Sequence, residues 1–279
     1  MNHSSLRSFT VVELLISVSI GILLSLLFLK TIDSTGQVIQ RNRQSMSCAE
    51  EADFIFQRLK TDFQQMPKRL DIGYEMTNAG FGTDFIRIIS EVKGYGGERK
   101  VSLVGYRLVR DQNGLITLQR GSRGYGWEDS GFMGIDRSGA PIRLGTLPPS
   151  LGLEDKGYDL LSSSIFKVSL AFQIKNNGQY SNSPPTLRLG TNAAYSSINI
   201  TNIASIIVGV VAMDAKSTRL LTPEINERIL EKFTEVPNGI LPISHWGSNF
   251  NADFPEFKKD LPPEIARSVH IFQRIFPME

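Results

Sequence analysis

A single carboxylate, Glu13, interrupts the most apolar stretch of this sequence, residues 9–29. A charge at the centre of a bilayer costs roughly 2.5–3.5 kcal/mol on insertion scales unless it is paired or lies near the interface. Two interpretations follow. Glu13 is an interfacial carboxylate favoured by the positive end of a helix, or it pairs with a cation at the same depth, such as the amino terminus of a neighbouring chain.

The other reactive residue types do not form a catalytic set. Cys48 is the only cysteine, so no internal disulfide is possible, and its surroundings predict a half-buried helical residue. His245 and His270 are isolated, without a ligand at metal-binding spacing, and His3 precedes the apolar stretch. The sequence contains no phosphate-binding loop and no Gly-x-Ser-x-Gly nucleophile motif. We therefore expect a protein that is not an enzyme, with no metal and no cofactor.

The most unusual polar stretch is RGSRGYGWEDSG, residues 120–131. Its side chains suited to stacking on a base or a sugar are Arg120, Arg123, Tyr125 and Trp127. They are the candidate contacts of a binding loop; the alternative is a glycine-rich loop whose tryptophan covers the core edge. The formal net charge is only +2, and no long block of like charges occurs, so we expect no nucleic acid partner.

The apolar stretch has the length of a membrane span. As a helix, residues 9–29 would extend about 31 Å, which matches the hydrocarbon thickness of a bilayer. A cleaved secretory signal has a shorter apolar run followed by small residues at the cleavage site. Here the run continues to Leu29 and ends at Lys30. We expect it to remain in the mature protein as a membrane anchor.

The residues from Ser8 to Leu15, SFTVVELL, together with the apolar run that follows, resemble the class III signal of type IV pilins and pseudopilins. The resemblance implies that a prepilin peptidase cuts between Ser8 and Phe9 and methylates the amine of Phe9. It also implies that Glu13 pairs with a neighbouring subunit's amine during assembly. The sequence departs from the family in one respect, because the residue before the cut is usually glycine and here it is Ser8.

Beyond the apolar run, the helical pattern continues. The positions that recur at helical spacing, here called the apolar stripe, are Ala52, Ile55, Phe56, Leu59, Phe63 and Met66. The polar residues between them, including Asp53, Lys60 and Asp62, fit a solvated flank. Pro67 predicts the end of the helix near residue 65.

The rest of the chain predicts antiparallel strands followed by helices. Strands are indicated at 84–92, 101–110, 115–120, 165–174 and 203–214, the last as an apolar run covered on both faces. Asn113-Gly114 favours a hairpin turn. Residues 121–160 and 181–197 are expected to be loops. Helices are expected after Thr222 and over 262–276, the latter with Ile265, Val269, Phe272 and Phe276 on one stripe.

The strand region also resembles a narrower family, the prepilin-like proteins called Verru_Chthon cassette protein C. The matching segments are IISEVKGYGGERKVSLVGYRLV, LQRGSRGYGW, FKVSLAFQI and IASIIVGVVAMDAKSTRLLTP. The expected fold is α+β, with a long N-terminal helix packed on an antiparallel sheet domain with long loops and C-terminal helices. The expected parts are a leader (1–8), a transmembrane half-helix (9–29), an amphipathic half-helix (30–66), a sheet domain (67–221) and a helical region (222–279).

Three functions are compatible with these features. The first is a minor pilin or pseudopilin of a type IV pilus or type II secretion-like fibre, whose partners are the prepilin peptidase, other subunits and inner-membrane lipid. Its globular domain is expected to be periplasmic, with a single membrane pass. The second is a membrane-anchored periplasmic binding module that does not polymerise. The third is an anchored hydrolase, but the sequence does not identify a nucleophile and base for it.

Overall fold

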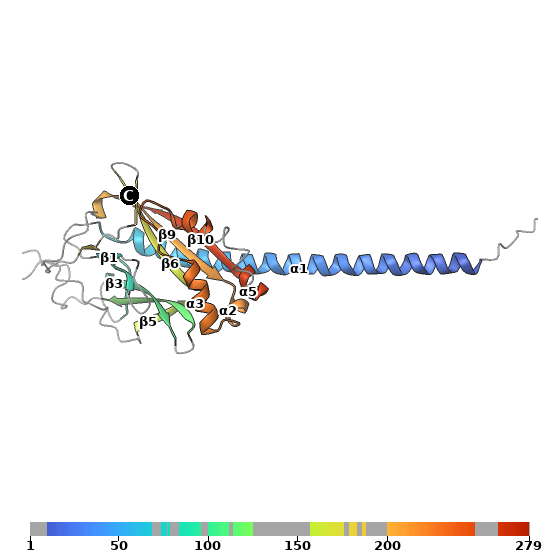
Figure 1. Ribbon diagram of the computed structural model, residues 1–279. Coiled ribbons are helices and arrows are strands. Elements are labelled where there is room, and N and C mark those ends of the chain that lie inside the picture. Colours follow the sequence, from blue (N-terminus) through green and yellow to red (C-terminus); the bar gives the residue numbers. More distant parts are fainter. Residues whose placement is uncertain are drawn as a thin grey trace, which may run out of the picture. The chain divides into compact units, whose positions relative to one another are not determined.

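The structure is a computed structural model that describes residues 10–68, 74–76, 78, 84–95, 100–111, 114–124, 157–175, 179–182, 186–187, 200–248 and 262–278. The chain divides into two compact units, residues 1–46 and 47–279. The first helix, α1 (Val11–Gln64), contributes to both units. Each unit is described separately, and Figure 1 labels the elements.

The second unit contains two antiparallel sheets. The larger sheet has the strand order β5-β4-β3-β2-β1-β8, and the smaller sheet has the order β10-β9-β6-β7. The larger sheet consists of β1 (Tyr74–Met76), β2 (Asp84–Ser90), β3 (Ser102–Arg110), β4 (Ile116–Gly124), β5 (Tyr158–Ser162) and β8 (Thr186–Leu187). The smaller sheet consists of β6 (Ile165–Ile174), β7 (Tyr180–Ser181), β9 (Ile203–Met213) and β10 (Val269–Pro277). The helical elements are η2 (Ile200–Asn202), α2 (Ala215–Thr218), α3 (Pro223–Lys232), a turn of helix at 242–248 and α5 (Pro263–Ser268).

The meander predicted from the sequence is confirmed as β2-β3-β4. Each pair is antiparallel, and β3 pairs with β4 over nine residues from Ser102↔Gly124 to Arg110↔Ile116. Gly114 has a φ of 78°, as the predicted turn between β3 and β4 requires, because only glycine adopts this region without strain. The strand β4 extends to Gly124, so the first residues of the predicted 121–160 loop belong to the sheet.

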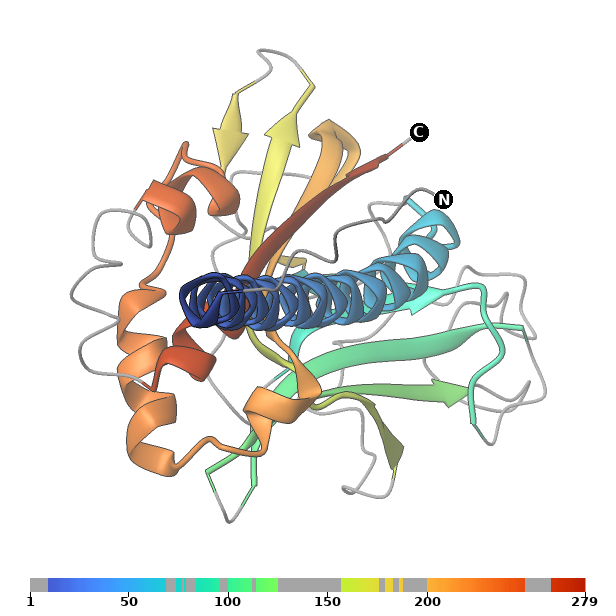
Figure 2. The ribbon, with the colours of Figure 1, turned by 90° about the vertical axis from the view of Figure 1, so that its right-hand side faces the viewer.

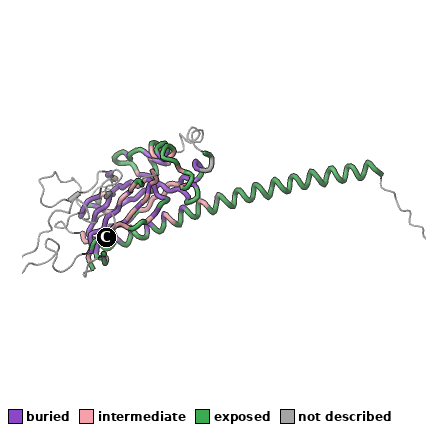
Figure 3. Tube along the Cα trace, turned by 90° about the horizontal axis from the view of Figure 1, so that it is seen from below, coloured by how far each residue is buried: buried purple, intermediate pink, exposed green. Residues whose placement is uncertain are grey.

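The central strand of the smaller sheet is β9, which is buried along nearly its whole length. Its neighbours β6 and β10 pair with it on either side. Because successive residues of β9, whose side chains point to opposite faces, are buried, the prediction that both faces are covered is confirmed. Figure 3 shows the burial concentrated along the strands of this unit.

The apolar stripe of α1 is confirmed, since all six of its residues are buried. The packing brings two of its rings against one strand of the smaller sheet: the Phe56 and Phe63 centroids lie 6.2 Å and 5.4 Å from that of Phe276. The helix ends at Gln64, as predicted from Pro67. Two carbonyl groups at the end of α1 accept hydrogen bonds from the larger sheet. Ser90 Oγ in β2 donates to Asp62 O, and Glu91 N, just after β2, donates to Gln65 O.

The predicted helix over 262–276 is wrong beyond residue 268. Helix α5 stops at Ser268, and Val269–Pro277 forms β10, paired with β9 at nine positions from Val269↔Met213 to Pro277↔Ser205. The sequence VHIFQRIFP has apolar residues at spacings that fit a helix and a strand equally. Nine ladder pairs with a buried strand stabilise the extended form, a long-range contribution that local spacing does not contain.

The helix predicted after Thr222 is confirmed as α3. Thr222 Oγ1 accepts the amide of Ile225 at 3.3 Å, and Pro223 occupies the first turn. Residues 125–156 and 188–199, which make up most of the two predicted loops, 121–160 and 181–197, lie outside the described residues.

The described start of the second loop corrects the prediction that it is exposed. Ser181 and Asn182, at the start of the loop predicted to be exposed, are buried.

Gly209 lies where β9 is covered by the turn of helix at 242–248. A Cβ at Gly209 would lie 2.4 Å from Pro242 Cβ and 3.2 Å from the Trp246 ring. We predict that Gly209→Ala lowers the free energy of unfolding by about 1–3 kcal/mol, because the added methyl overpacks a filled contact. Gly247→Ala is the matched control, since a Cβ there meets no atom within 4 Å. Denaturant melts of the two variants check this; equal stabilities would contradict it.

Candidate functional site: the N-terminal helix

Helix α1 has a first portion that is apolar and exposed along its length. It is the one helix, among the described residues, long and apolar enough to cross a membrane. Its large side chains from Val11 to Leu29 are all at least half exposed. This agrees with a single-pass membrane protein.

Three hydroxyl groups in and just after the apolar run, those of Ser19, Ser25 and Thr31, donate to carbonyl groups of the helix itself. Ser19 Oγ donates to Leu15 O, Ser25 Oγ to Gly21 O and Thr31 Oγ1 to Leu27 O, at 2.8–2.9 Å. Each bond reaches back one turn, the pattern by which serine and threonine avoid an unpaired hydroxyl in lipid. These bonds lower the cost of burying the Ser19 and Ser25 hydroxyl groups in lipid. Glu13 is the only ionisable group of the run.

Glu13 lies in the first turn of α1 and is bonded within its own chain. Its Oε2 accepts hydrogen bonds from Thr10 N at 3.0 Å and Thr10 Oγ1 at 2.9 Å, and Glu13 N donates to Thr10 Oγ1 at 3.3 Å. This reciprocal arrangement is a capping box, which satisfies two donors at the helix start. Both acceptor bonds end on Oε2, so Oε1 is available to a cation from outside the chain. Ser8 and Phe9, the predicted cleavage residues, lie outside the described residues.

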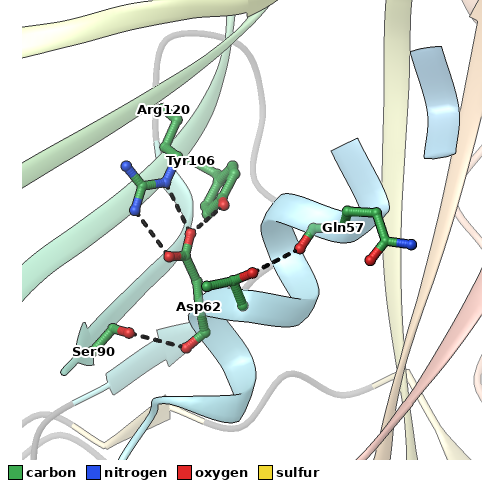
Figure 4. Close-up of polar contacts among 6 residues, drawn as sticks. Gln57, Asp62, Ser90, Tyr106 and Arg120 are labelled. Atoms are coloured by element: carbon green, nitrogen blue, oxygen red, sulfur yellow. Dashed lines mark hydrogen bonds and ion pairs between the residues drawn. The ribbon is translucent and has the colours of Figure 1, made fainter. Parts of the chain in front are cut away.

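The last turns of α1 carry a buried polar cluster, which we call the Asp62 cluster: Asp62, Tyr106 and Arg120 (Figure 4). Asp62 has an exposed fraction of 0%. Arg120 binds it with two hydrogen bonds, Nε to Oδ2 at 2.8 Å and Nη2 to Oδ1 at 2.9 Å, and the Tyr106 hydroxyl donates to Oδ2. Ser90 Oγ donates to the backbone carbonyl of Asp62. The neighbouring strands β2, β3 and β4 therefore each place a side chain on this one residue of the helix.

The charges of the Asp62 cluster are mutually dependent. Burial lowers the pKa of the Arg120 guanidinium, but the hydrogen bonds and charge of Asp62, with Tyr106, outweigh that effect and leave the pKa above its ordinary value. Burial, and then the charge of Asp62, raises the pKa of the Tyr106 hydroxyl well above its ordinary value. Arg120 is therefore charged and Tyr106 neutral, a suitable pair of donors for a buried carboxylate.

The cluster corrects two predictions from the sequence. Asp62 was expected on a solvated flank and is fully buried. Arg120 was expected in a binding loop, but it lies in β4 with its side chain turned to α1. Arg123 also lies in β4 and is exposed, whereas Tyr125 and Trp127 lie outside the described residues. The sequence contains one signal for the cluster: Asp62 is a charged residue within two turns of positions predicted to be buried. It does not indicate that Arg120 is the partner of Asp62.

The other candidate reactive residues that the structure describes include His245 and His270. Among the described residues, no group of three or more His, Cys, Asp and Glu side chains is placed to hold a metal ion. Burial lowers the pKa of His270, opposed by the charge of Asp214. His245 shares a hydrogen bond of 3.1 Å with Thr234 Oγ1, which fits a structural role.

Cys48 is buried beside two acidic residues. Burial, and then the charges of Asp214 and Glu51, raises the pKa of its thiol from 9.0 to about 12. A raised pKa in the folded state favours the neutral thiol, so this contribution to stability is complete below pH 9.0 and is lost as the pH rises toward about 12. The thiolate is the reactive form, and it is almost absent near neutral pH.

We predict that Cys48 in the folded full-length chain resists alkylation by iodoacetamide in mildly alkaline buffer and reacts on unfolding. The matched control moves the thiol by one residue, to the exposed neighbouring position, in Cys48→Ser combined with Ser47→Cys. That variant should be alkylated rapidly without denaturant. Intact mass reports both rates, and rapid labelling of native Cys48 would show that the thiol is accessible.

Comparison with known proteins finds no matching family model, curated protein or solved structure.

Proposed function

We propose that this chain is a membrane-anchored structural subunit of a fibre, of the minor pilin or pseudopilin kind, processed between Ser8 and Phe9. The observation that carries the proposal is the division of α1. One end is apolar, exposed and carries a single carboxylate in its first turn, and the other end is fixed on the sheets by the apolar stripe and the Asp62 cluster. An anchor alone requires neither the carboxylate nor a helix that continues into the folded domain.

The role proposed for Glu13 is alignment between subunits. A buried ion pair contributes little net stability but specifies register, because a carboxylate left unpaired in lipid is costly. The free Oε1 of Glu13 supplies the acceptor, and the amine of Phe9 on a neighbouring subunit supplies the cation. The proposed partners are the prepilin peptidase, other subunits and inner-membrane lipid, and the proposed location of the folded domain is the periplasm.

The alternative, a membrane-anchored binding module that does not polymerise, has less support. One candidate contact of its binding loop was Arg120, but the Arg120 guanidinium forms an ion pair with Asp62. The size of the domain supports a low-copy subunit, because bulky domains with long insertions fit a tip position better than dense repetition along a shaft.

The test is whether the chain enters fibres in its own host. Fibres are sheared or released from cells, sedimented and probed for the full-length protein. A matched variant replaces residues 9–29 with an unrelated membrane span that lacks a carboxylate. The proposal predicts the native chain in the fibre fraction and the variant only in the membrane fraction. Equal distribution of the two proteins would contradict it.

A further inference from the structure

The strand β10 is an open edge of the smaller sheet. It pairs with β9 along all nine of its residues, and no described strand pairs with its other side. Figure 2 shows β10, in red, at the outer side of β9. An edge of this length with free backbone groups is a template for another strand, which proteins usually protect with charge, bulges or proline.

The direction of the free backbone groups follows from one bond at the end of the strand. Met278 N donates to Ala204 O at 2.8 Å, so the ladder groups of Met278 point toward β9. Since these groups alternate in direction along an antiparallel strand, those of Ile271, Gln273, Ile275 and Pro277 point away from β9. Pro277 has no N–H, which fits an outward position. With Val269 at the start of β10, four amide groups, those of Val269, Ile271, Gln273 and Ile275, therefore line the open edge.

A groove lies between this edge and α1. It has a volume of about 330 Å³, and its lining includes Lys60 and Phe63 from α1 and Arg274, Ile275, Phe276 and Pro277 from β10. Phe63 and Phe276 form an apolar floor. Ile275 is half exposed, with an exposed fraction of 50%. A strand edge beside a helix groove is an arrangement that binds extended peptides by strand addition, with side-chain pockets that set specificity.

The charges of the groove select the occupant. Lys60 and Arg274 are cations on opposite walls. Arg274 is bonded to Asp53 Oδ1 at 2.6 Å, while Lys60 has no carboxylate partner among the described residues. Because the charge of Arg274 is balanced by Asp53 and that of Lys60 is not, these groups give the groove a net positive charge. Pairing of β10 with β10 of a second copy would bring two such walls together, and like charges oppose that contact.

We propose that β10 and this groove bind an extended acidic segment of another protein as an added strand. Its backbone pairs with Ile271, Gln273 and Ile275. On its α1-facing side, a carboxylate meets Lys60 and, two residues away, an apolar side chain covers Phe63 and Phe276. This interaction does not depend on fibre assembly, because all of its residues belong to the second unit.

The test uses the full-length protein in detergent micelles and a display library of random peptides of about ten residues, enough to span β10. We expect enrichment of peptides with an acidic residue two positions from an apolar one and without proline. Ile275→Pro removes an outward N–H that makes no ladder bond, and should weaken the selected peptides about tenfold or more. The matched control Ile275→Val keeps the N–H and should bind normally. Lys60→Glu should also weaken binding and favour peptides with basic residues.

Folding of each variant is checked by near-UV circular dichroism, and Lys60→Glu keeps the test decisive if Ile275→Pro is unstable, because residue 60 is exposed. Equal binding by Ile275→Pro and Ile275→Val, or the absence of an acidic motif, would overturn the proposal. So would self-association through β10, measured as a dimer in the native chain that Ile275→Pro abolishes.

Discussion

Replacing Asp62 with alanine is expected to lower the free energy of unfolding by about 3–5 kcal/mol. The reason is the burial of Arg120, which would keep its charge while losing both hydrogen bonds to the carboxylate. Tyr106 would lose its acceptor as well. Urea denaturation of the full-length chain in micelles, followed by tryptophan fluorescence, measures the change.

Asp53→Ala is the matched control for that measurement. It removes another carboxylate of α1 that pairs with an arginine of a strand, Arg274, but both side chains are substantially exposed. Exposed pairs contribute about 0–1 kcal/mol, so a small change is expected. If the two alanine variants are equally stable, the Asp62 cluster does not fix the helix to the sheet.

A double replacement separates the cost of an unpaired charge from the contribution of the pair. Asp62→Leu with Arg120→Met removes both charges and keeps most of the side-chain volume. Because buried ion pairs seldom stabilise more than apolar residues of similar shape, the double variant should be clearly more stable than Asp62→Ala. A double variant as unstable as the single one would mean that the packing, and not the orphaned charge, causes the loss.

The second large effect is expected at Glu13. Glu13→Ala should leave the thermal unfolding midpoint unchanged, since the residue lies in the first turn of α1 and is exposed. The same change should abolish incorporation into fibres, because it removes the only carboxylate available to pair with the amine of Phe9. Quantitative immunoblots of the sedimented fibre fraction measure incorporation, and circular dichroism of the purified chain measures the midpoint.

Ser19→Ala serves as the matched control for Glu13→Ala. It also removes a polar side chain from the apolar run, but that side chain bonds only to Leu15 O within the same helix. Normal incorporation is expected for Ser19→Ala. Normal incorporation of Glu13→Ala would remove the proposed role in register and favour a simple anchor.

The features that the sequence predicted correctly are those encoded by nearby residues. The apolar stripe repeats within five turns of α1, and the cap at Thr222 and the glycine turn at 114 depend on adjacent positions. Strand β9 is recognisable in the sequence because its near-continuous apolar run has the length of a strand and is too short for a membrane span. Its burial agrees with that prediction. In each case, local spacing and burial agree.

The features that the sequence did not predict depend on partners far along the chain. Asp62 resembles a solvated residue next to Lys60, and only the fold brings Arg120, from β4, to its carboxylate. The apolar residues of β10 fit two periods, and pairing with β9 selects the strand. The division of the strands into two sheets likewise depends on which edges meet. Long-range pairing, and not composition, determined these outcomes.

The amino terminus of the native protein tests the central claim most directly. The protein is purified from host membranes, with and without its prepilin peptidase, and its intact mass and first residues are determined. The account predicts a chain that begins at Phe9 and carries one extra methyl group, found only when the peptidase is present. A chain that keeps residues 1–8 in both strains would contradict it, and would mean that Ser8 prevents processing and that α1 is only a membrane anchor.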